Sequence, residues 1–219
     1  MLLSNQKKFL TIDIPKTGTR SLRETLVPLG IIDVIGHPNP SSEIYQHATG
    51  RQIEQYLISK NINIKDYFVF SIVRNPWSRF FSHFNYLLKW KEKYENKSDE
   101  DDWDENMERQ GFESKRLFDT HIKDEKIIQV LANVHQSQYD YLINSKNELM
   151  VDFCAKMETL EKDFEFFCKK NEINKKIELK HSNKNNIYNK SYQDFYSNKS
   201  KNIIKNHEHK IINLFQYEF

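Results

Sequence analysis

The chain has 219 residues, of which 38% are apolar and 13% aromatic. This is enough to bury a hydrophobic core in one folded domain, which argues against a disordered protein. The formal net charge of +2 is too small to indicate a nucleic-acid or membrane-surface partner, and no run of about 18 apolar residues predicts a transmembrane helix.

The cysteines and the first residues suggest the compartment. The first fifteen residues lack the basic segment, long apolar stretch and cleavage site of a secretory leader, so we expect a cytoplasmic protein. Cys154 and Cys168 show no CxxC spacing and no clustered histidines. We therefore expect two isolated buried thiols, rather than a structural zinc site or a disulfide.

Strands and helices are predicted to alternate along the chain. Apolar runs rich in β-branched residues predict strands at residues 8–14, 31–35, 67–73 and 150–154. Helical periodicity predicts helices after residues 21, 49 and 75, and over residues 118–134, 160–170 and 200–214. This alternation indicates an α/β fold with a mostly parallel sheet.

Three of these helices have recognisable start signals. Ser21 with Glu24, and Thr49 with Gln52, have the spacing of a capping box. Asn75 is a favourable N-cap, and a proline suits the first helical position that follows it. The first and third helices therefore follow directly on the two most strand-like segments.

Polar turns follow these two strands, at the edge of a parallel sheet where ligands bind. In the first turn, Lys16 and the backbone amides of residues 17–21 stand at a helix start, which suits a phosphate or sulfate group. It is not a Walker A loop, because Lys16 precedes Gly18. Taken alone, the pattern also fits an ordinary strand-to-helix turn.

In the second turn, Arg74 ends the strand and Ser82 lies eight residues further on. A guanidinium can bind a phosphate through two parallel hydrogen bonds. Taken alone, this turn also fits a purely structural role. The two turns together are much more specific than either one.

At this point the sequence resembles a known family. PKTGTRSL, starting at Pro15, is similar to the 5′-phosphosulfate loop of the sulfotransferases that use 3′-phosphoadenosine 5′-phosphosulfate (PAPS). VFSIVRNPWSRFFSHFNYL, starting at Val69, is similar to their 3′-phosphate motif. The relatives in question are carbohydrate O-sulfotransferases, including those of heparan sulfate, with their bacterial and viral homologues. Further similarities, at residues 138–142, 151–153, 158–163, 181–184 and 215–219, extend the resemblance over nearly the whole chain.

The resemblance implies a P-loop-like fold of three layers, with a central sheet flanked by helices. It also implies one sulfotransferase domain over residues 1–219, interrupted by a polar loop or insertion at about 95–113. The function implied is transfer of a sulfuryl group from PAPS to an acceptor hydroxyl by in-line displacement, with PAP (3′-phosphoadenosine 5′-phosphate) as the product and no metal.

The resemblance also assigns the cofactor-binding residues. Lys16 would contact the 5′-phosphate and the bridging oxygen of the leaving group, which gives it a catalytic role. Arg74 and Ser82 would hold the 3′-phosphate, and Lys184 resembles a basic residue of a late loop that folds over the cofactor. The remaining loop contacts to the phosphosulfate would come from Thr17, Gly18, Thr19, Arg20 and Ser21. Arg20 departs from the family pattern, in which a small or hydroxyl residue is more common.

His47 is the predicted catalytic base. It lies between the two motifs and just ahead of the helix that follows Thr49, like the histidine that deprotonates the acceptor in heparan sulfate sulfotransferases. A histidine pKa near 6.5 suits a base at neutral pH. The alternative is a solvated loop histidine. The other candidates, ranked lower, are His37, His83, His121, His135 and His181.

Two other functions stay open at this stage. A P-loop nucleotide kinase would need Mg²⁺ and a Walker-type lysine, and a non-catalytic domain that binds anions or glycans would have kept the fold but lost turnover. The resemblance favours a sugar as the acceptor, with residues 36–46 and 95–109 as candidate acceptor loops. The pattern predicts neither the particular acceptor nor the oligomeric state.

Overall fold

The computed structural model describes residues 1–39, 41–95, 128–129, 132, 136–173, 177–180 and 191–219. The chain divides into two compact units. The first unit consists of Met1–Arg74 with Gln138–Asn185, and the second of Asn75–Ser137 with Asn186–Phe219. The predicted helix at 118–134 and the polar stretch at 95–113 lie almost entirely outside the described residues.

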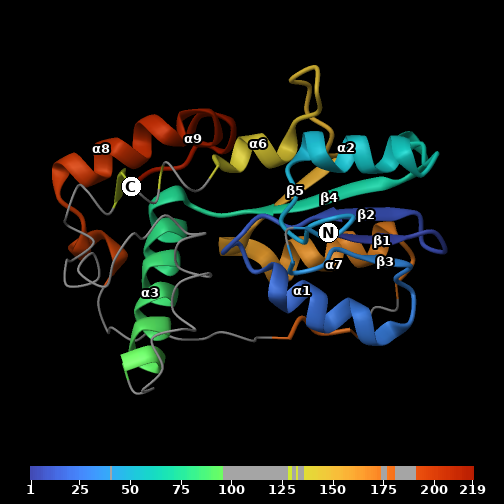
Figure 1. The fold of residues 1–219 in the computed structure, drawn as a ribbon, viewed down its shortest axis with the longest axis horizontal. Helices are drawn as coiled ribbons and strands as arrows, with labels where there is room; N and C mark the ends of the chain where they lie inside the picture. Colours follow the sequence, from blue (N-terminus) through green and yellow to red (C-terminus); the bar gives the residue numbers. More distant parts are fainter. Residues whose placement is uncertain (40, 96–127, 130–131, 133–135, 174–176, 181–190) are drawn as a thin grey trace. The chain divides into compact units, whose positions relative to one another are not determined.

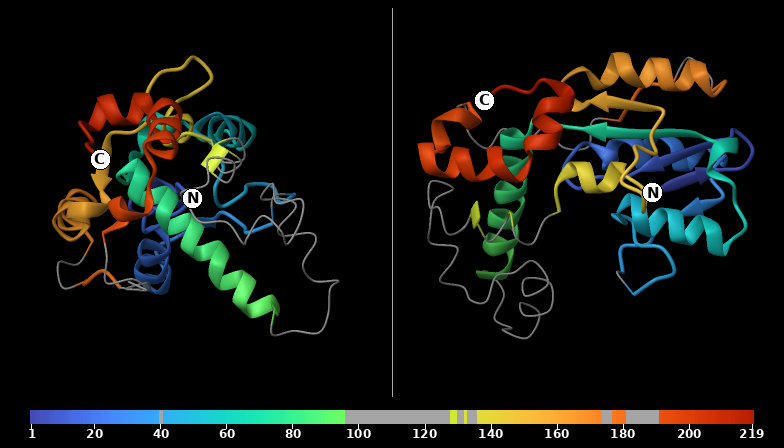
Figure 2. Two further views of the ribbon diagram at one scale, coloured as in Figure 1. Left: turned by 90° about the vertical axis from the view of Figure 1, so that its left-hand side faces the viewer. Right: turned by 90° about the horizontal axis from the view of Figure 1, so that it is seen from above.

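A five-stranded sheet forms the centre of the first unit. Its strands are β1 (Leu2–Ser4), β2 (Phe9–Ile12), β3 (Val34–Ile35), β4 (Phe68–Val73) and β5 (Phe153–Lys156), in the order β3-β1-β2-β4-β5. β4 pairs in parallel with both β2 and β5, and these strands lie side by side in the right-hand view of Figure 2. Only β1 runs against the other four, because it pairs antiparallel with β2 and β3. The predicted mostly parallel sheet is confirmed.

Helices cover both faces of this sheet (Figure 1). α1 (Thr19–Leu26) and α7 (Leu160–Lys170) lie on one face, and α2 (Gly50–Ser59) with the short α6 (Gln138–Leu142) on the other. The first unit is therefore a three-layer α/β structure, as predicted. Short 3₁₀ turns follow α1, precede β4 and precede α7, at Val27–Leu29, Ile64–Asp66 and Met157–Thr159.

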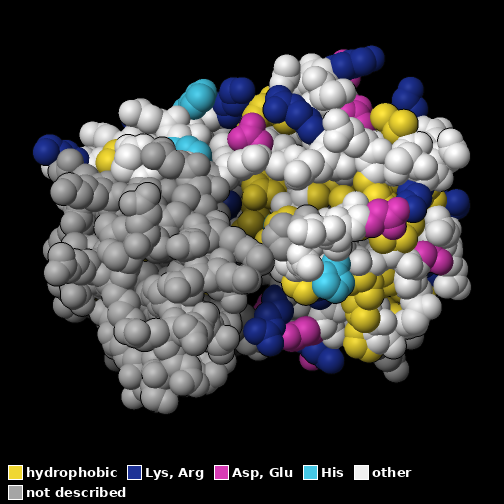
Figure 3. All heavy atoms as spheres, in the orientation of Figure 1, with side chains coloured by type: hydrophobic (Ala, Val, Ile, Leu, Met, Phe, Trp, Pro, Cys, Tyr) yellow, Lys and Arg dark blue, Asp and Glu magenta, His cyan; other side chains and the backbone are white. Residues whose placement is uncertain are grey.

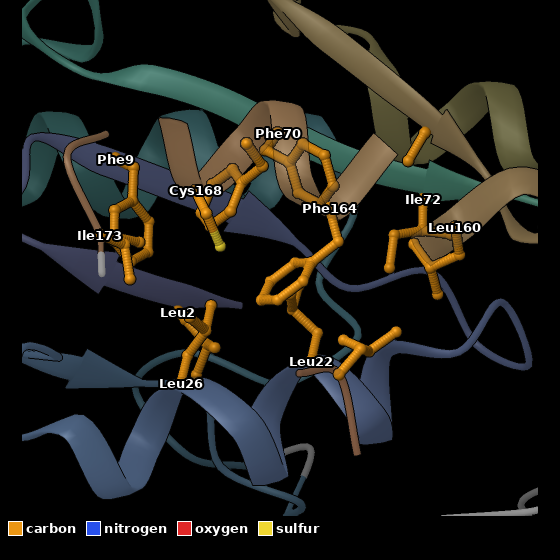
Figure 4. Packing of buried hydrophobic residues seen from close by; sticks show 13 residues of the cluster. Leu2, Phe9, Leu22, Leu26, Phe70, Ile72, Leu160, Phe164, Cys168 and Ile173 are labelled. Atoms are coloured by element: carbon orange, nitrogen blue, oxygen red, sulfur yellow. The ribbon is translucent and has the colours of Figure 1, made fainter. Parts of the chain in front are cut away.

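A large hydrophobic core lies between the sheet and the two helices α1 and α7 (Figure 4). Phe9 and Phe70 reach down from the sheet and meet Phe167 of α7, with ring centroids 5.1 and 4.6 Å from that ring. Leu22 and Leu26 close the layer from α1. Aromatic side chains bury large areas, and such contacts stabilise the unit beyond the effect of burial alone.

The helices predicted correctly are those whose sequence pattern lies within the helix itself or at its first residues. α7 has the predicted limits, and the capping box of Thr49 and Gln52 opens α2 as expected. The capping box of Ser21 and Glu24 was wrong, because α1 already begins at Thr19, with Gly18 as its N-cap. β1 was not predicted, β3 has only two residues, and β5 begins at Phe153 instead of residue 150.

The second unit is helical in its described residues. It contains α3 (Pro76–Glu95), a 3₁₀ turn (Tyr192–Phe195), α8 (Asn198–His207) and α9 (His209–Phe215). The Asn75 side chain caps α3 as predicted, since its Oδ1 accepts from the N–H of Ser78 at 3.2 Å. Trp77, Phe80, Phe84 and Ile204 belong to the core of this unit.

The single helix predicted for residues 200–214 is instead two helices, interrupted at Glu208. The side chain of Glu208 is fully buried and pairs with Arg79 of α3 at 2.7 Å. The polar pattern of the sequence did not reveal that a glutamate points inward here. No helix among the described residues is long and apolar enough to cross a membrane.

Candidate functional site

Two neighbouring parallel strands place the predicted turns at one edge of the sheet. β2 and β4 pair in a register that sets Ile12 opposite Ser71, and the Ser71 hydroxyl donates to the Ile12 carbonyl at 2.9 Å. Both strands end within a few residues of this pair. The turns that follow therefore leave the sheet at the same carboxyl edge, which is where ligands bind in α/β folds.

The first turn has a tightly defined backbone. Lys16 and Gly18 both adopt positive φ angles, of 68° and 90°. Between them the buried hydroxyl of Thr17 donates to the Ile14 carbonyl at 2.9 Å. The φ of Gly18 favours glycine, and a Cβ there would lie 2.5 Å from Sδ of Met157, so any other residue would require that side chain to move.

This turn ends at the N-terminus of α1, which has no side-chain cap. The positive end of the helix dipole and the first N–H groups favour an anion there. Thr19 is buried and Ser21 half-buried in the first helical turn. The exposed side chain of Arg20 pairs with Glu24 one turn along the helix at 2.7 Å, so it extends along the helix surface.

Arg74 joins the second turn to the first. Its guanidinium Nη1 donates to the carbonyl of Lys16 at 3.2 Å, which brings residues 58 positions apart into contact. The backbone of Arg74 is held by Gln138, whose side-chain amide exchanges two hydrogen bonds of 2.9 Å with it. The structure thus places the predicted phosphosulfate loop and the predicted 3′-phosphate arginine side by side.

His47 is fixed at the base of the same loop. Its Nδ1 lies 2.8 Å from the carbonyl oxygen of Asp13, three residues before Lys16. A carbonyl only accepts, so Nδ1 carries the proton and Nε2 has the lone pair. The ring also meets Tyr45 edge-on, with centroids 5.7 Å apart. His47 is therefore a half-buried, oriented imidazole, and not the solvated loop histidine of the alternative interpretation.

The environment of His47 changes its expected titration. Burial lowers the pKa of His47 to about 4, and the hydrogen bond and charge of Asp13 offset this only in part. The pKa of His47 thus lies well below the reference value of about 6.5 for histidine. The imidazole is neutral throughout the neutral pH range, which is the form that can accept a proton.

Asp13 is a buried carboxylate that the sequence did not single out. It pairs with the α-amino group of Met1 at 2.8 Å and with Arg23 of α1 at 3.0 Å, and it accepts from the Thr11 hydroxyl at 3.0 Å. Burial alone would raise the pKa of Asp13, but the α-amino group and Arg23 outweigh it and hold that pKa below its ordinary value. Asp13 thus links β2, α1 and the backbone that orients His47.

Two of the predicted cofactor-binding residues, Ser82 and Lys184, are not among the described residues of the first unit. Ser82 is half-buried on α3, which belongs to the second unit. Lys184 lies outside the described residues. Their contact with a cofactor stays a prediction. The sequence motifs did not predict roles for Asp13, Arg23 and Gln138, although Gln138 lies in the segment 138–142 that is similar to the family.

Basic and acidic side chains are interspersed over the coloured part of the face in Figure 3. Among the described residues, no group of three or more His, Cys, Asp or Glu side chains is arranged to hold a metal ion.

The two cysteines are not activated thiols. Cys168 is buried and Cys154 half-buried, and burial raises the pKa of the Cys168 thiol to about 11 and that of the Cys154 thiol to about 12. Neither thiol has the low pKa of a nucleophile.

Comparison with models of protein families places the whole chain in a family. The model of a family described as the sulfotransferase family matches residues 1–219, which include every position discussed above. No curated protein and no solved structure matches the chain.

Proposed function

Because the chain belongs to the sulfotransferase family, whose members are PAPS-dependent enzymes, we propose that it transfers the sulfuryl group of PAPS to a carbohydrate hydroxyl, with Lys16 and His47 as catalytic residues. The observation that carries this proposal is the contact of Arg74 with the Lys16 carbonyl at 3.2 Å. It joins two anion-binding turns at one sheet edge, as a donor with phosphate groups at both ends requires.

The residues present suit this donor. The loop of residues 16–18 is held in a fixed backbone conformation by the positive φ angles of Lys16 and Gly18 and by the hydrogen bond of Thr17 to the Ile14 carbonyl. The uncapped start of α1 favours a phosphosulfate group, and the guanidinium of Arg74 suits a phosphate. Residues 16–21 would hold the phosphosulfate, while Arg74 and Ser82 would hold the 3′-phosphate and Lys184 would close over the donor. When bound, PAPS supplies the sulfuryl group, and PAP is left.

Lys16 provides positive charge at the loop. In an in-line transfer between two oxygens, negative charge grows on the leaving phosphate, and the protein contributes mainly by positioning and by electrostatic stabilisation. The positive φ of Lys16 and the buried anchor of Thr17 fix the backbone from which the lysine side chain projects. This charge has the function that Mg²⁺ shares with a lysine in nucleotide kinases.

His47 removes the proton from the acceptor hydroxyl. The Asp13 carbonyl holds Nδ1–H, so Nε2 is the atom that accepts the proton. The lowered pKa keeps the base neutral at neutral pH, but it also makes the imidazole a weaker base than a free histidine. The negative donor, once bound nearby, would favour the protonated form and so aid the transfer.

A hollow lined by residues on both sides of His47 in the sequence supports a sugar acceptor. Its volume is about 330 Å³, and besides the apolar Ile44 and Ala48 it is lined by hydroxyl, amide and carboxylate side chains and by tyrosines: Ser42, Glu43, Tyr45, Gln52, Gln55, Tyr56 and Ser59. Tyr45, whose ring contacts His47, is one of them. Groups of this kind can donate to and accept from sugar hydroxyls and can cover their apolar faces.

The donor is tested first, by calorimetric titration with PAP and AMP. PAP is expected to bind much more tightly, and Arg74→Ala should remove most of the preference, on the order of 2–5 kcal/mol. A transfer assay with radiolabelled PAPS and a panel of glycans then tests the reaction, with mass spectrometry to detect the added sulfate. Equal affinity for PAP and AMP, or sulfation of peptides and simple alcohols but of no glycan, would contradict the proposal.

A further inference from the structure

Gln138 makes an unusual pair of contacts with the backbone of Arg74. Its side-chain Oε1 accepts from the Arg74 N–H, and its Nε2 donates to the Arg74 carbonyl, both at 2.9 Å. The side chain of Gln138 is fully buried. One carboxamide therefore satisfies both backbone groups of the residue that ends the central strand.

This arrangement continues the hydrogen-bond ladder of the sheet beyond its last strand pair. The pairing of β4 with β5 ends at Val73 and Lys156, and that with β2 ends at Ser71. Arg74 is thus the first residue after the ladder. A glutamine side chain has the same donor and acceptor as a peptide group, so Gln138 takes the place of a neighbouring strand at this position.

The clamp fixes the direction of the Arg74 side chain. With the backbone held by Gln138 and the guanidinium held by the Lys16 carbonyl, Arg74 is tied at both ends. A side chain oriented in advance loses less conformational entropy when a ligand binds. Binding groups supported in this way discriminate between ligands more sharply than groups on a loose backbone.

We propose that Gln138 is a positioning residue that, through Arg74, sets the selectivity of the site for a nucleotide with a 3′-phosphate. The inference rests on the proposed function, in which Arg74 binds that phosphate. It adds that selectivity depends on a residue that itself touches no ligand. It also predicts that contacts with the 5′-phosphate, made by the loop after β2, do not depend on Gln138.

The test compares the Kd of PAP and of AMP in the unmutated protein and in Gln138→Met. Methionine has a similar length but removes both hydrogen bonds. In Gln138→Met the preference for PAP should fall at least about tenfold while the affinity for AMP stays nearly constant. Asn171→Leu is the matched control: it removes another buried amide, which donates to the Phe167 carbonyl at 2.8 Å, and should leave the preference unchanged.

The outcomes separate this inference from the proposed function. If the unmutated protein binds PAP and AMP equally, the proposed function is wrong. If it prefers PAP and Gln138→Met keeps that preference, or Asn171→Leu loses it equally, the inference about Gln138 is wrong. Hydrogen exchange of the unmutated protein gives a measurement independent of any variant's folding. The Arg74 amide should exchange as slowly as that of Val73 in β4, and fast exchange would overturn the clamp.

Discussion

Lys16 is the residue on which the proposed chemistry depends most. Charge grows on the leaving phosphate only as the reaction proceeds, so the lysine contributes more to the transition state than to the bound product. Lys16→Ala should lower turnover by about 10²- to 10³-fold, while the affinity for PAP falls much less. Initial rates with PAPS and titration with PAP measure the two effects. Lys65→Ala, at an exposed position, is the control.

The same charge argument predicts how the enzyme responds to metal removal. Lys16 and the amides of α1 supply the positive field, so turnover should persist in the presence of EDTA. Rates measured before and after dialysis against the chelator test this. Loss of activity that returns on addition of Mg²⁺ would show that the assignment of the charge to Lys16 is incomplete.

His47 allows a prediction for the base itself. His47→Ala should reduce turnover by about two to four orders of magnitude and leave PAP binding nearly unchanged, because the imidazole faces the acceptor in our proposal. His37→Ala, an exposed histidine of the preceding loop, should have little effect. If His37→Ala is impaired and His47→Ala is not, the base has been misassigned.

The lowered pKa of His47 predicts the pH at which this group affects stability. In the unfolded chain a histidine titrates near 6.5, but in the folded protein His47 titrates at about 4. Between these values the unfolded chain binds more protons, so the contribution of His47 to the free energy of unfolding is present above pH 6.5 and lost as pH falls toward 4. Denaturant titrations at several pH values should show a smaller loss of stability over this range in His47→Gln. An equal slope in both proteins would contradict the shift.

At the scale of elements, the turn between β2 and α1 depends on glycine for two reasons. Gly18 has a φ of 90°, and a Cβ there would lie 2.5 Å from Sδ of Met157. Gly30 has a φ of 67° but nothing within 4 Å of its Cβ position. Both replacements by alanine carry the backbone strain, of about 1–2 kcal/mol, and only Gly18→Ala adds a collision, which costs a further ~1–3 kcal/mol.

Chemical denaturation of the two variants measures the difference between them. Gly18→Ala should lower the free energy of unfolding clearly more than Gly30→Ala does, and shortening the neighbour in Gly18→Ala/Met157→Ala should recover part of the gap. Equal losses in the two single variants would mean that Met157 moves aside without cost, and that only the φ angle requires glycine.

The elements predicted correctly are those whose signal is local. α7 shows helical periodicity over its full length, β4 is nearly all apolar, and Thr49 caps α2 through a residue three positions away. β1 has only three residues, and its strand geometry is created by pairing with β2 and β3, which no local pattern records. The true cap of α1, Gly18, adopts a left-handed conformation, and the neighbour that a Cβ there would meet is Met157, more than a hundred residues away.

At the scale of the whole molecule, the motifs indicated the family and the positions of the candidate site, but not the contacts that assemble it. Lys16, Arg74 and His47 could be named from the sequence because each stands at a fixed place in or between two motifs. The bonds of Arg74 to Lys16 and Gln138 span about sixty residues and depend on strand order. The environment that lowers the pKa of His47 is likewise a tertiary property, since burial and not sequence position causes it.

The second unit offers a test of how much a buried ion pair contributes to the stability of the chain. Arg79 of α3 and Glu208 at the break between α8 and α9 are almost completely buried and lie 2.7 Å apart, and Glu208 also accepts from the Ser137 hydroxyl at 2.8 Å. Arg79→Met leaves a buried carboxylate without its cation and should cost about 3–5 kcal/mol. In Arg79→Met/Glu208→Met both charges are replaced by apolar groups, and most of that loss should be recovered.

Tryptophan fluorescence suits this measurement, because all three tryptophans of the sequence, at positions 77, 90 and 103, lie between Asn75 and Ser137. The denaturation midpoint should be lowest for Arg79→Met and intermediate for the double variant. A single variant as stable as the unmutated protein would show that Glu208 takes up a proton or reaches water once Arg79 is gone. A double variant no more stable than Arg79→Met would show that the pair is needed to set the direction of the chain between α8 and α9, because two apolar side chains then could not replace it.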